Sequence, residues 1–346
     1  MTTTALVLFR DDLRLADNPA LAAACAHHDA VVPVFFLDAE EPHSPGAAAR
    51  YWLHQSLRAL EESLRERGSR LLLRTGADVL ALVHETQAQA VYWNRRYAPG
   101  AILADTALKA RLQEAGIAAH SYNASLLMEP WEVHTTTGGH FRVFTPFWRA
   151  CNRLGNFSEP FPAPQRIPAP EVWPKSLALE ELALEPRIDW AGGIREYWTF
   201  GEAAAMARLQ GFLHERVAHY GTQRDMLAED GVSSLSPHLR FGEISPRQVL
   251  HYAQEVATEN GVGVEAYLRQ IFWREFAYHL LYHEPQTIDQ PLHKNFERFP
   301  WRDDPEALRR WQRGQTGYPV VDAAMRQLWH TGWMHNRARM IVGSFL

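Results

Sequence analysis

The first 130 residues alternate short apolar runs with amphipathic helical patterns, and this alternation restricts the fold more than any other feature of the chain. Four runs have the length and composition of strands that are covered on both faces: ALVLFR, AVVPVFFLD, RLLLRTG and AVYWNRRY. Between them, apolar residues recur three and four positions apart, as in helices. Strands that alternate with helices predict a parallel, doubly wound (Rossmann-like) sheet over residues 1–130.

The segment that follows, residues 131–198, is predicted to be an interdomain linker. Its central part, residues 155–190, contains seven prolines, which lack the backbone donors that helices and sheet ladders need. We therefore expect a long connector that lies over the protein surface and is anchored by its Trp and Phe side chains.

From residue 199 to residue 346 the pattern is helical, and we expect an all-α domain without strands. Thr199 and Glu202 have the spacing of a capping box. Ser236, Ser245 and Asp304 each precede a proline and are predicted helix N-caps. The sequence stops within the apolar run MIVGSFL without a cap or a polar tail, so we expect the domain to continue beyond it.

The composition is that of a folded, soluble protein, with 46% hydrophobic and 22% charged residues. The two cysteines, Cys25 and Cys151, cannot form a disulfide framework, which fits a reducing cytoplasm. The N-terminus lacks the pattern of a signal peptide, and no apolar run is long enough to span a membrane. We predict a cytoplasmic monomer with no membrane partner and no metal site.

The net charge of −5 argues against a general nucleic-acid-binding coat. Charge is unevenly distributed, because residues 294–346 carry 9 basic and 5 acidic side chains whereas residues 151–293 carry 12 and 19. A locally positive C-terminal stretch permits an anionic partner at one face, although an excess this small is also typical of a solvated surface. The twelve tryptophans exceed what packing requires in a chain of this size.

Residues 219–248 hold Tyr220, Arg224 and a cluster of serines before a Ser-Pro helix start. Hydroxyl groups, free backbone N–H groups and a nearby guanidinium can together bind a phosphate. For the serines alone, an ordinary loop with an N-cap is the better explanation.

Residues 267–284, YLRQIFWREFAYHLLYHE, form an aromatic helical stretch. At helical spacing, Gln270, Trp273, Arg274 and Ala277 share one face. Polar residues on both sides of Trp273 are the arrangement needed to stack a flat ligand and bond its edges. The alternative is an ordinary core helix, which explains any single residue better.

Residues 314–340 contain a turn at 317–319, then a helical pattern that breaks at Gly332. The following letters, WMHNRARM, place Asn336, Arg337 and Met340 on nearby turns. An amide and a guanidinium can bond a heterocycle edge and a phosphate. A basic, solvated helix end explains this segment equally well on its own.

Taken together, the three segments resemble the photolyase/cryptochrome family of flavoproteins, and in particular the bacterial class I cyclobutane pyrimidine dimer photolyases. The resemblance rests on VLFRDDLRLADNPAL near the start and on LSPHLRFGEISPR, WREF, FPWR, GYPVVDAAMRQL and GWMHNRARM further on. It covers the whole chain, and its last two motifs are highly specific. The fold it implies is an α/β antenna domain joined by a long linker to a helical FAD-binding catalytic domain.

The resemblance implies a U-shaped FAD in the helical domain. The cofactor-binding positions that it implies are Tyr220, Arg224, Ser233, Ser234, Leu235, Ser236, Tyr267, Gln270, Arg274, Asn336 and Arg339. Family members commonly have Thr where this chain has Val232, so Ser233 or backbone N–H groups must replace one hydroxyl. The usual Asp partner of Arg339 would follow residue 346.

The activity implied is light-driven repair of cyclobutane pyrimidine dimers in UV-damaged DNA, with an electron from reduced FAD. The implied catalytic positions are Gln270, Trp273, Asn336 and Met340, and the implied DNA-binding positions are Trp273, Arg337 and Met340. Trp273 would stack on the flipped-out dimer. Gln270 stands where many dimer photolyases have Glu, and Gln cannot supply a proton or a negative charge. The (6-4) photolyases carry a His-rich version of HNRARM, so this stretch favours the dimer as substrate.

The resemblance indicates the residues for electron transfer and light harvesting less specifically. Trp301 in FPWR matches the outermost Trp of the wire that reduces the flavin, or it is a surface-packed Trp. Asp38 and Arg50 match positions that contact a deazaflavin antenna in some members. Ala101 stands where a folate-contacting Glu is expected, and Arg96 where a deazaflavin-contacting Asp is common. The antenna, methenyltetrahydrofolate or a deazaflavin, is therefore left open.

A cryptochrome, with the same fold and flavin but a signalling role, is the main alternative to a repair enzyme. Cryptochromes often lose the Glu at the position of Gln270, whereas Trp273 and Met340 favour repair. A flavin- or nucleotide-binding protein without photochemistry is less compatible with the GYPVVDAAMRQL and GWMHNRARM pair.

Overall fold

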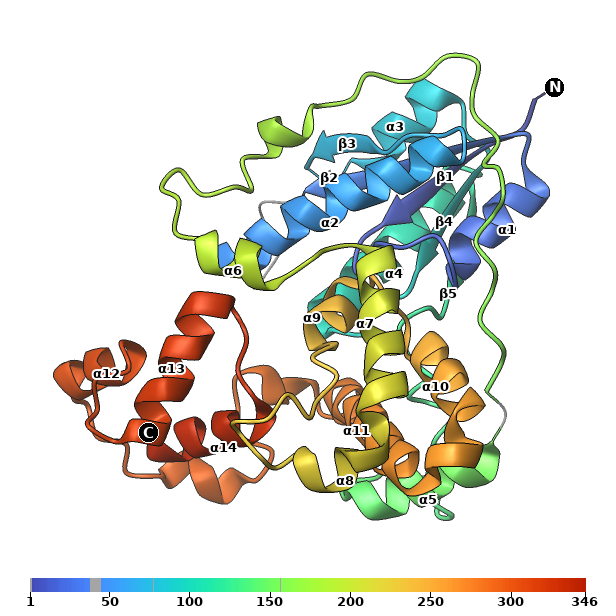
Figure 1. Ribbon diagram of the computed structural model, residues 1–346. Coiled ribbons are helices and arrows are strands. Elements are labelled where there is room, and N and C mark those ends of the chain that lie inside the picture. The colour runs from blue at the N-terminus through green and yellow to red at the C-terminus, as the bar shows by residue number, and fades with distance from the viewer. Residues whose placement is uncertain (1, 38–44, 77, 156) are drawn as a thin grey trace.

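The computed structural model describes residues 2–37, 45–76, 78–155 and 157–346, with an α/β part followed by a helical part (Figure 1). The strands are β1 (Thr4–Phe9), β2 (Ala30–Leu37), β3 (Leu72–Thr75), β4 (Ala90–Asn94) and β5 (Ala118–Tyr122). They form one sheet in the order β3-β2-β1-β4-β5, and every pair is parallel. The predicted fold, a doubly wound parallel sheet joined to a helical domain, is confirmed.

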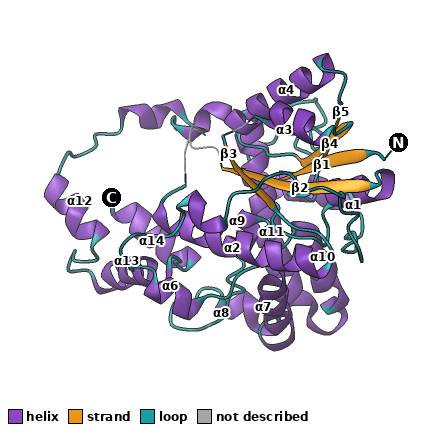
Figure 2. Cartoon of the chain, turned by 90° about the horizontal axis from the view of Figure 1, so that it is seen from above, coloured by secondary structure: helices purple, strands orange, loops and turns teal. Residues whose placement is uncertain are grey.

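Helices cover both faces of the sheet (Figure 2). They are α1 (Pro19–His27), α2 (Ala47–Glu66), α3 (Val79–Thr86) and α4 (Pro99–Glu114). Along β1 the side chains alternate: Val7 and Phe9 pack with α1 and α2, whereas Leu6 and Leu8 pack with α3 and α4. Burial on both faces explains why the central strands are apolar at nearly every position.

After β5 the chain enters the helical part before it forms the proline-rich connector. Helix α5 (Phe144–Leu154) packs there through Phe144 and Phe147. The connector then returns to the sheet domain and runs over its surface (Figure 1). Both backbone groups of Leu73 bond to it, because Leu73 N–H donates to the hydroxyl of Ser176 and Leu177 N–H donates to Leu73 C=O. The connector therefore covers the edge strand β3.

No strand occurs in the described residues after 122. The helices there are α5, α6 (Gly192–Tyr197), α7 (Glu202–Glu215), α8 (Tyr220–Gln223), α9 (Ser236–Phe241), α10 (Pro246–Glu255), α11 (Ala257–His283), α12 (Pro305–Gln312), α13 (Pro319–Thr331) and α14 (Asn336–Phe345). Short 3-10 turns lie at Leu179–Leu182, Val217–His219, Pro285–Ile288 and Lys294–Arg298. One core joins α5, α7, α10 and α11, and a smaller one joins α13 and α14. None of the described helices has both the length and the apolar character needed to cross a membrane.

Two predicted helix caps are confirmed. The hydroxyl of Ser245 accepts the N–H of Gln248 at the start of α10, and the Gln248 side chain accepts the N–H of Ser245 in return. The carboxylate of Asp304 accepts the N–H of Ala307 at the start of α12. Each of these bonds satisfies a backbone donor that the first helical turn leaves free.

The other two cap predictions are wrong. Ser236 is the first residue of α9 and provides no side-chain cap. The capping box of Thr199 and Glu202 is absent, because α7 begins at Glu202 with Gly201 as its N-cap. The Glu202 carboxylate instead accepts the N–H groups of residues 15 and 16 in the loop after β1, at 2.7 and 2.9 Å. A tertiary contact between the two parts of the molecule replaces the local one.

The same loop carries Arg14, whose side chain is 1% exposed and joins three segments. Its guanidinium donates to the carbonyl oxygens of Asp17 (2.6 Å), Ala124 (2.8 Å) and Gly242 (3.0 Å). Gly242 ends α9 with a φ of 67°, and a Cβ there would lie 2.0 Å from the carbonyl oxygen of Asp11. The helical part is thus docked on the sheet domain through backbone that leaves no room for a side chain.

A second buried junction centres on Glu243, which has no exposed surface. Its carboxylate accepts the Ser56 hydroxyl (2.6 Å), the Gly201 N–H (2.9 Å) and the Trp52 indole N–H (3.3 Å). It also pairs with Nδ1 of the buried His238. Helix α2 of the sheet domain is therefore hydrogen-bonded to α9 and to the start of α7.

We expect Gly242→Ala to lower the free energy of unfolding by at least about 2 kcal/mol, because alanine is strained at this φ and overlaps the loop after β1. Urea denaturation measures the change. Gly211→Ala in α7 is the matched control, since a Cβ at Gly211 meets no atom within 4 Å. The control is expected to raise stability by up to about 1 kcal/mol. Equal effects of the two substitutions would contradict the proposed close contact.

Candidate functional site

Helix α11 presents the aromatic stretch that the sequence singled out. Ile271, Phe272 and Phe276 are buried in the helical core, whereas Trp273 is 48% exposed. Gln270 and Arg274 are partly buried. The helix therefore has a core side and a second side, where a half-exposed indole has polar neighbours in the sequence.

The Trp273 ring contacts two phenylalanines of the helical core, and it meets Phe276 edge to face with ring centroids 5.8 Å apart. It stacks on Phe144 of α5, with ring centroids 3.8 Å apart and planes inclined by 10°. Phe144 is 4% exposed, so it belongs to the core and gives the indole a fixed support. Because Trp273 is half-exposed, it keeps accessible aromatic surface for a flat ligand.

Gln270 is bonded to its own helix. Its side-chain amide donates to the carbonyl oxygen of Ala266 at 3.2 Å. A primary amide has two N–H donors and a carbonyl acceptor, so one donor and the oxygen stay available for a ligand. Gln270 lies three positions before Trp273, and residues at that spacing are neighbours on a helix surface.

A second group of predicted residues surrounds the loop before α9. Tyr267 is buried, and its hydroxyl lies near Ser233 without forming a hydrogen bond of normal geometry to any described residue. Burial raises the pKa of Tyr267, which keeps the hydroxyl protonated as a donor. Ser234 is buried with a left-handed φ of 52°, Leu235 is buried, and Ser236 begins α9.

The third predicted segment, residues 314–340, contacts this region through an ion pair. Arg337 Nε lies 2.6 Å from a carboxylate oxygen of Asp225, and Arg224 Nε lies 3.5 Å from the same oxygen. Arg337 foremost, and then Arg224, lower the pKa of Asp225. The sulfur of Met340 is 3.7 Å from Arg337, and Arg224 lies over the ring of Tyr220. The first turn of α14 is thus tied to the end of α8.

Other implied flavin positions have different surroundings. Arg274 donates to the carbonyl oxygen of Ser125 at 2.7 Å and lies over the ring of Tyr278. This contact directs at least one guanidinium nitrogen toward the segment that leaves the sheet domain. Asn336 and Arg339 are exposed on α14.

Of the residues assigned to electron transfer and the antenna, Trp301 and Arg50 contact other segments. Trp301 is 71% exposed, and its ring neighbour is Phe299, with centroids 4.6 Å apart. Arg50 on α2 donates to the carbonyl oxygen of Ala183 in the connector at 2.8 Å. Asp38 lies outside the described residues.

Comparisons with known proteins agree with this architecture. Residues 5–165 match the DNA photolyase family, and residues 267–346 match the FAD binding domain of DNA photolyase. The deoxyribodipyrimidine photo-lyase of Agrobacterium fabrum is 44% identical over 351 residues, which cover all of this chain and 73% of that protein. The chain belongs to the photolyase/cryptochrome family.

Both branches of the family are represented among its relatives. Cryptochrome-2 of Arabidopsis thaliana is 37% identical over 366 residues, covering all of this chain and 59% of that protein. A bacterial class III photolyase structure from Agrobacterium tumefaciens has a TM-score of 0.97 at 43% identity, over all of this chain and 73% of that one. A Synechocystis cryptochrome structure has a TM-score of 0.88 at 29% identity, over 99% and 74%. The sequence motifs suggested a class I photolyase, whereas the similar Agrobacterium tumefaciens structure is of class III. The comparisons therefore support the family and not the class I assignment.

The residues around the loop before α9 fit the FAD that the family domain implies. The buried Tyr267 hydroxyl and the Ser233 hydroxyl are donors for an anionic oxygen, and Arg224 adds a charged donor. The rings of Tyr220 and Tyr267 lie 5.4 Å apart and give the same region an aromatic wall. Gln270 follows Tyr267 by about one helical turn, which connects the loop with the exposed side of α11.

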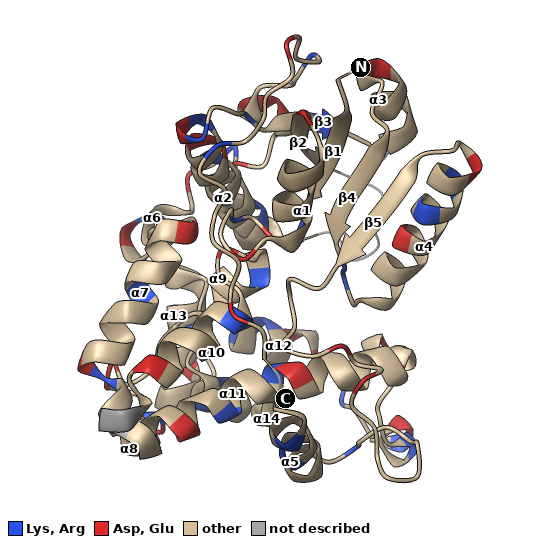
Figure 3. Cartoon of the chain, turned by 90° about the vertical axis from the view of Figure 1, so that its right-hand side faces the viewer, with Lys and Arg blue, Asp and Glu red and all other residues tan. Residues whose placement is uncertain are grey.

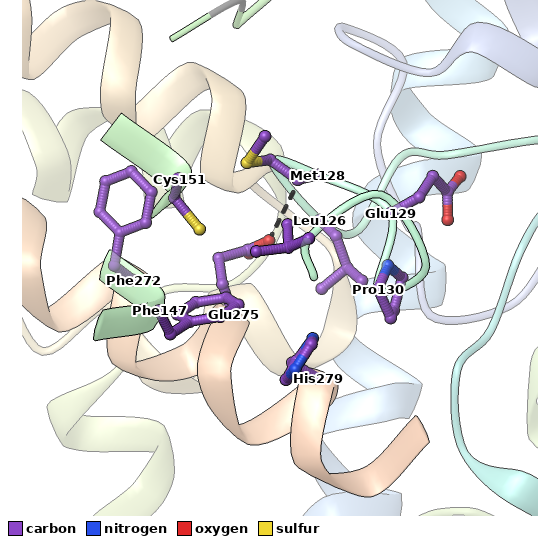
Figure 4. A pocket seen from close by; sticks show the side chains of 10 residues that line it. Leu126, Met128, Glu129, Pro130, Phe147, Cys151, Phe272, Glu275 and His279 are labelled. Atoms are coloured by element: carbon purple, nitrogen blue, oxygen red, sulfur yellow. Dashed lines mark hydrogen bonds between the residues drawn. The ribbon is translucent and has the colours of Figure 1, made fainter. Parts of the chain in front are cut away.

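Below this surface, the buried carboxyl of Glu275 anchors α11 to the segment after β5. One oxygen accepts the N–H groups of Leu127 (2.8 Å) and Met128 (3.4 Å), as Figure 4 shows for Met128. Beside it is a cavity of ≈10 Å³, a volume that suits one water molecule. Burial raises the pKa of Glu275 to about 7, against the opposing effects of Arg274 and of the two N–H bonds.

This raised pKa predicts a pH dependence of stability. Because the folded protein binds the Glu275 proton more tightly than the unfolded chain, the stabilisation is complete below about pH 4.5 and is lost as pH rises through about 7. Glu275→Gln cannot ionise and keeps an oxygen for both N–H groups. We expect the wild type to lose up to about 3 kcal/mol relative to this variant between about pH 5 and about pH 8.

Urea denaturation of both proteins across this pH range measures the difference. Glu66→Gln at an exposed position of α2 is the control and is expected to show a constant offset from the wild type. A constant offset for Glu275→Gln as well would contradict the raised pKa.

Two residues of the site were missed by the sequence interpretation. Phe144, the support of Trp273, lies in a segment that was predicted to be linker. Asp225, the partner of Arg337, directly follows Arg224 in the sequence, and an acidic residue next to a predicted phosphate-binding arginine is a signal that could have found it.

Proposed function

We propose that the protein repairs cyclobutane pyrimidine dimers in DNA by light-driven electron transfer from reduced FAD. The observation that carries this proposal is the indole of Trp273, supported on one face by Phe144 and half-exposed. A pyrimidine dimer lies inside the duplex stack, so an enzyme that acts on it must flip it out and bind it against a flat apolar surface. The relatives named photo-lyase agree with this activity.

The proposed role of the chain's own residues is to bind and orient. Trp273 stacks on the flipped dimer, while the free N–H of Gln270 donates to a carbonyl on the pyrimidine edge. Met340 and Asn336 on α14 complete the substrate side. Arg337 releases Asp225 and binds a DNA phosphate in its place. FAD, when bound, would supply the electron that opens the two C–C bonds of the cyclobutane ring and would take it back afterwards, so that the reaction has no net redox change.

For the flavin itself, the residues proposed to hold it fall into two groups. The loop and its surroundings would bind the phosphates; they are Tyr220, Arg224, Ser233, Ser234, Leu235, Ser236 and Tyr267. The positions proposed beside the flavin ring are Gln270, Arg274, Asn336 and Arg339. Trp301 is proposed as an outer electron-transfer residue, and its high exposure suits an entry point for electrons from solvent. Arg50 and Asp38 remain the proposed antenna positions, for a folate or a deazaflavin.

A cryptochrome-type photoreceptor is the second candidate, and Gln270 is the observation that favours it. A neutral amide cannot supply a negative charge or a readily transferred proton beside a reduced dimer, so repair is less well supported than with a carboxylate. Cryptochromes of plants and of Synechocystis are among the relatives.

The two candidates predict different photochemistry. With reduced FAD, we expect the protein to remove dimers from irradiated oligothymidine under near-UV or blue light and not in darkness. Gln270→Glu is expected to increase the repair yield, and Gln270→Ala to decrease it. Chromatographic analysis of the oligonucleotide measures both. Loss of dimers in darkness contradicts light-driven repair, and so does the absence of any dimer loss in light when the flavin is fully reduced. Absence of dimer loss in light, together with light-driven reduction of the flavin, supports the photoreceptor.

Stacking is tested separately by Trp273→Ala. We expect this variant to bind dimer-containing oligonucleotide more weakly by about 1–3 kcal/mol, the cost of losing one base–aromatic stack. Trp131→Ala is the matched control, because Trp131 has the same exposed fraction, 48%, and lies against Tyr282 instead of beside Gln270. Dark binding titrations give both affinities. An unchanged affinity for Trp273→Ala, or equal losses in the two variants, rules out the stacking role.

A further inference from the structure

A carboxylate occupies the arginine of α14 that is proposed to bind DNA. Asp225 lies just after α8, in a segment that runs beside α14 (Figure 1). One of its carboxylate oxygens is 2.6 Å from Nε of Arg337 and 3.5 Å from Nε of Arg224. A single negative charge therefore faces two arginines, one proposed to bind a phosphate of DNA and the other a phosphate of FAD.

The ion pair of Asp225 and Arg337 is open to solvent. The side chain of Arg337 is 37% exposed and that of Asp225 is 53% exposed. Arg337 foremost, and then Arg224, lower the pKa of Asp225, so its carboxylate is ionised at neutral pH. An exposed ion pair contributes little to stability, so its arginine is easily transferred to another anion.

The backbone that carries Arg337 is fixed independently of this pair. His335 directly precedes α14, and its Nδ1 accepts the backbone N–H of Arg337 at 3.1 Å. His335 is 4% exposed, so this helix cap is buried. The guanidinium can therefore change its partner while the first turn of α14 stays in place.

The same guanidinium contacts a residue that is proposed to face the dimer. Nη1 of Arg337 lies 3.7 Å from the sulfur of Met340, which is three positions further along α14. Asp225 and Met340 thus hold the Arg337 side chain from two directions. When this side chain turns toward a DNA phosphate, the thioether of Met340 is released as well.

We propose that Asp225 is an internal substitute for a DNA phosphate, which occupies Arg337 in the free protein and is displaced when a strand binds. This inference rests on the proposed function and adds a competing residue to its binding site. Carboxylate and phosphate oxygens accept the same charge-assisted hydrogen bond from a guanidinium, so the two anions compete for Arg337. Asp225 therefore lowers the affinity for every DNA strand, and stacking on Trp273 selects the damaged one.

The competition has a consequence for the salt dependence of binding. A phosphate that is neutralised by an arginine releases part of the cation atmosphere of the strand. In the wild type, the carboxylate that Arg337 leaves behind stays close to the strand and attracts a cation in return. The exchange of partners thus releases fewer cations than a contact made by an arginine without an acidic partner.

Dark binding titrations over a range of salt concentrations test this proposal with a labelled oligothymidine and with the same oligothymidine carrying one cyclobutane dimer. For Asp225→Asn we expect the slope of log K against log salt concentration to become more negative by about 0.7, the contribution of one phosphate contact to a single strand. The affinity at low salt is expected to rise by up to about fivefold. Both changes are expected to be equal for the two ligands, because phosphate contacts do not depend on the base. In D225N/R337Q the slope is expected to return to that of the wild type.

The matched control is Glu85→Gln, which removes a carboxylate that pairs with Arg74 at 2.7 Å, with side chains that are 41% and 27% exposed. Helix α3, which carries Glu85, lies at the opposite end of the molecule from α14 (Figure 3). The control is expected to keep the wild-type slope, and thermal unfolding of each variant verifies that the fold is intact.

An unchanged slope or weaker binding for Asp225→Asn overturns the proposal, and so do equal changes in the control. A slope of D225N/R337Q that stays as steep as that of Asp225→Asn overturns it too, because the contact is then not made by Arg337. If the wild type still prefers the dimer in these cases, the proposed repair function survives. A wild type that binds both ligands equally contradicts the repair function alone, and one that binds neither ligand overturns both.

Discussion

One buried guanidinium determines how the two parts of this molecule are joined. Arg14 bonds to carbonyl oxygens from its own loop, from the segment after β5 and from the end of α9. Burial lowers its pKa, while Asp17 foremost opposes that effect and favours the cation. A buried charge is tolerated only when its donors are satisfied, so these segments must stay together. Since α9 directly follows the loop at 233–235, the position of the proposed flavin-binding loop depends on this junction.

A second consequence of the docking concerns the aromatic surface of α11. The segment after β5 is bonded to Glu275 and then continues into α5. This path carries Phe144 to the back of the Trp273 ring, where it supports the indole from within the core. The proposed binding surface, which is one half-exposed ring, thus gains rigidity from the buried Phe144.

Most of the fold was predictable because its strands and helices have strong local patterns of apolar residues. The four apolar runs became β1 to β4, and the helical half carried no strand in its described residues. Strand β5 was missed because it lies at the edge of the sheet, where its mixed AAHSY sequence is largely solvated and carries no apolar run. Helix α5 was missed because Pro146 in its first turn and the nearby prolines resemble a linker.

The site was predictable only where its residues are neighbours in the sequence. Spacing alone placed Trp273 on the outer side of α11, away from the buried Ile271 and Phe272. Contacts between distant residues left no local signal: Phe144 and Trp273 are separated by more than a hundred positions, as are Asp225 and Arg337. The Glu202 capping box failed for the same reason, because two backbone donors of the sheet domain compete for its carboxylate.

The path of the proline-rich connector has a consequence for how the molecule comes apart. The chain leaves the sheet domain, contributes α5 to the helical core, returns to lie along β3, and only then completes the helical part. Cleavage of the chain at any point between β5 and α7 separates α5 from the rest of the helical core, the connector from strand β3, or both. The two parts are interleaved along the chain, and their unfolding is therefore coupled rather than sequential.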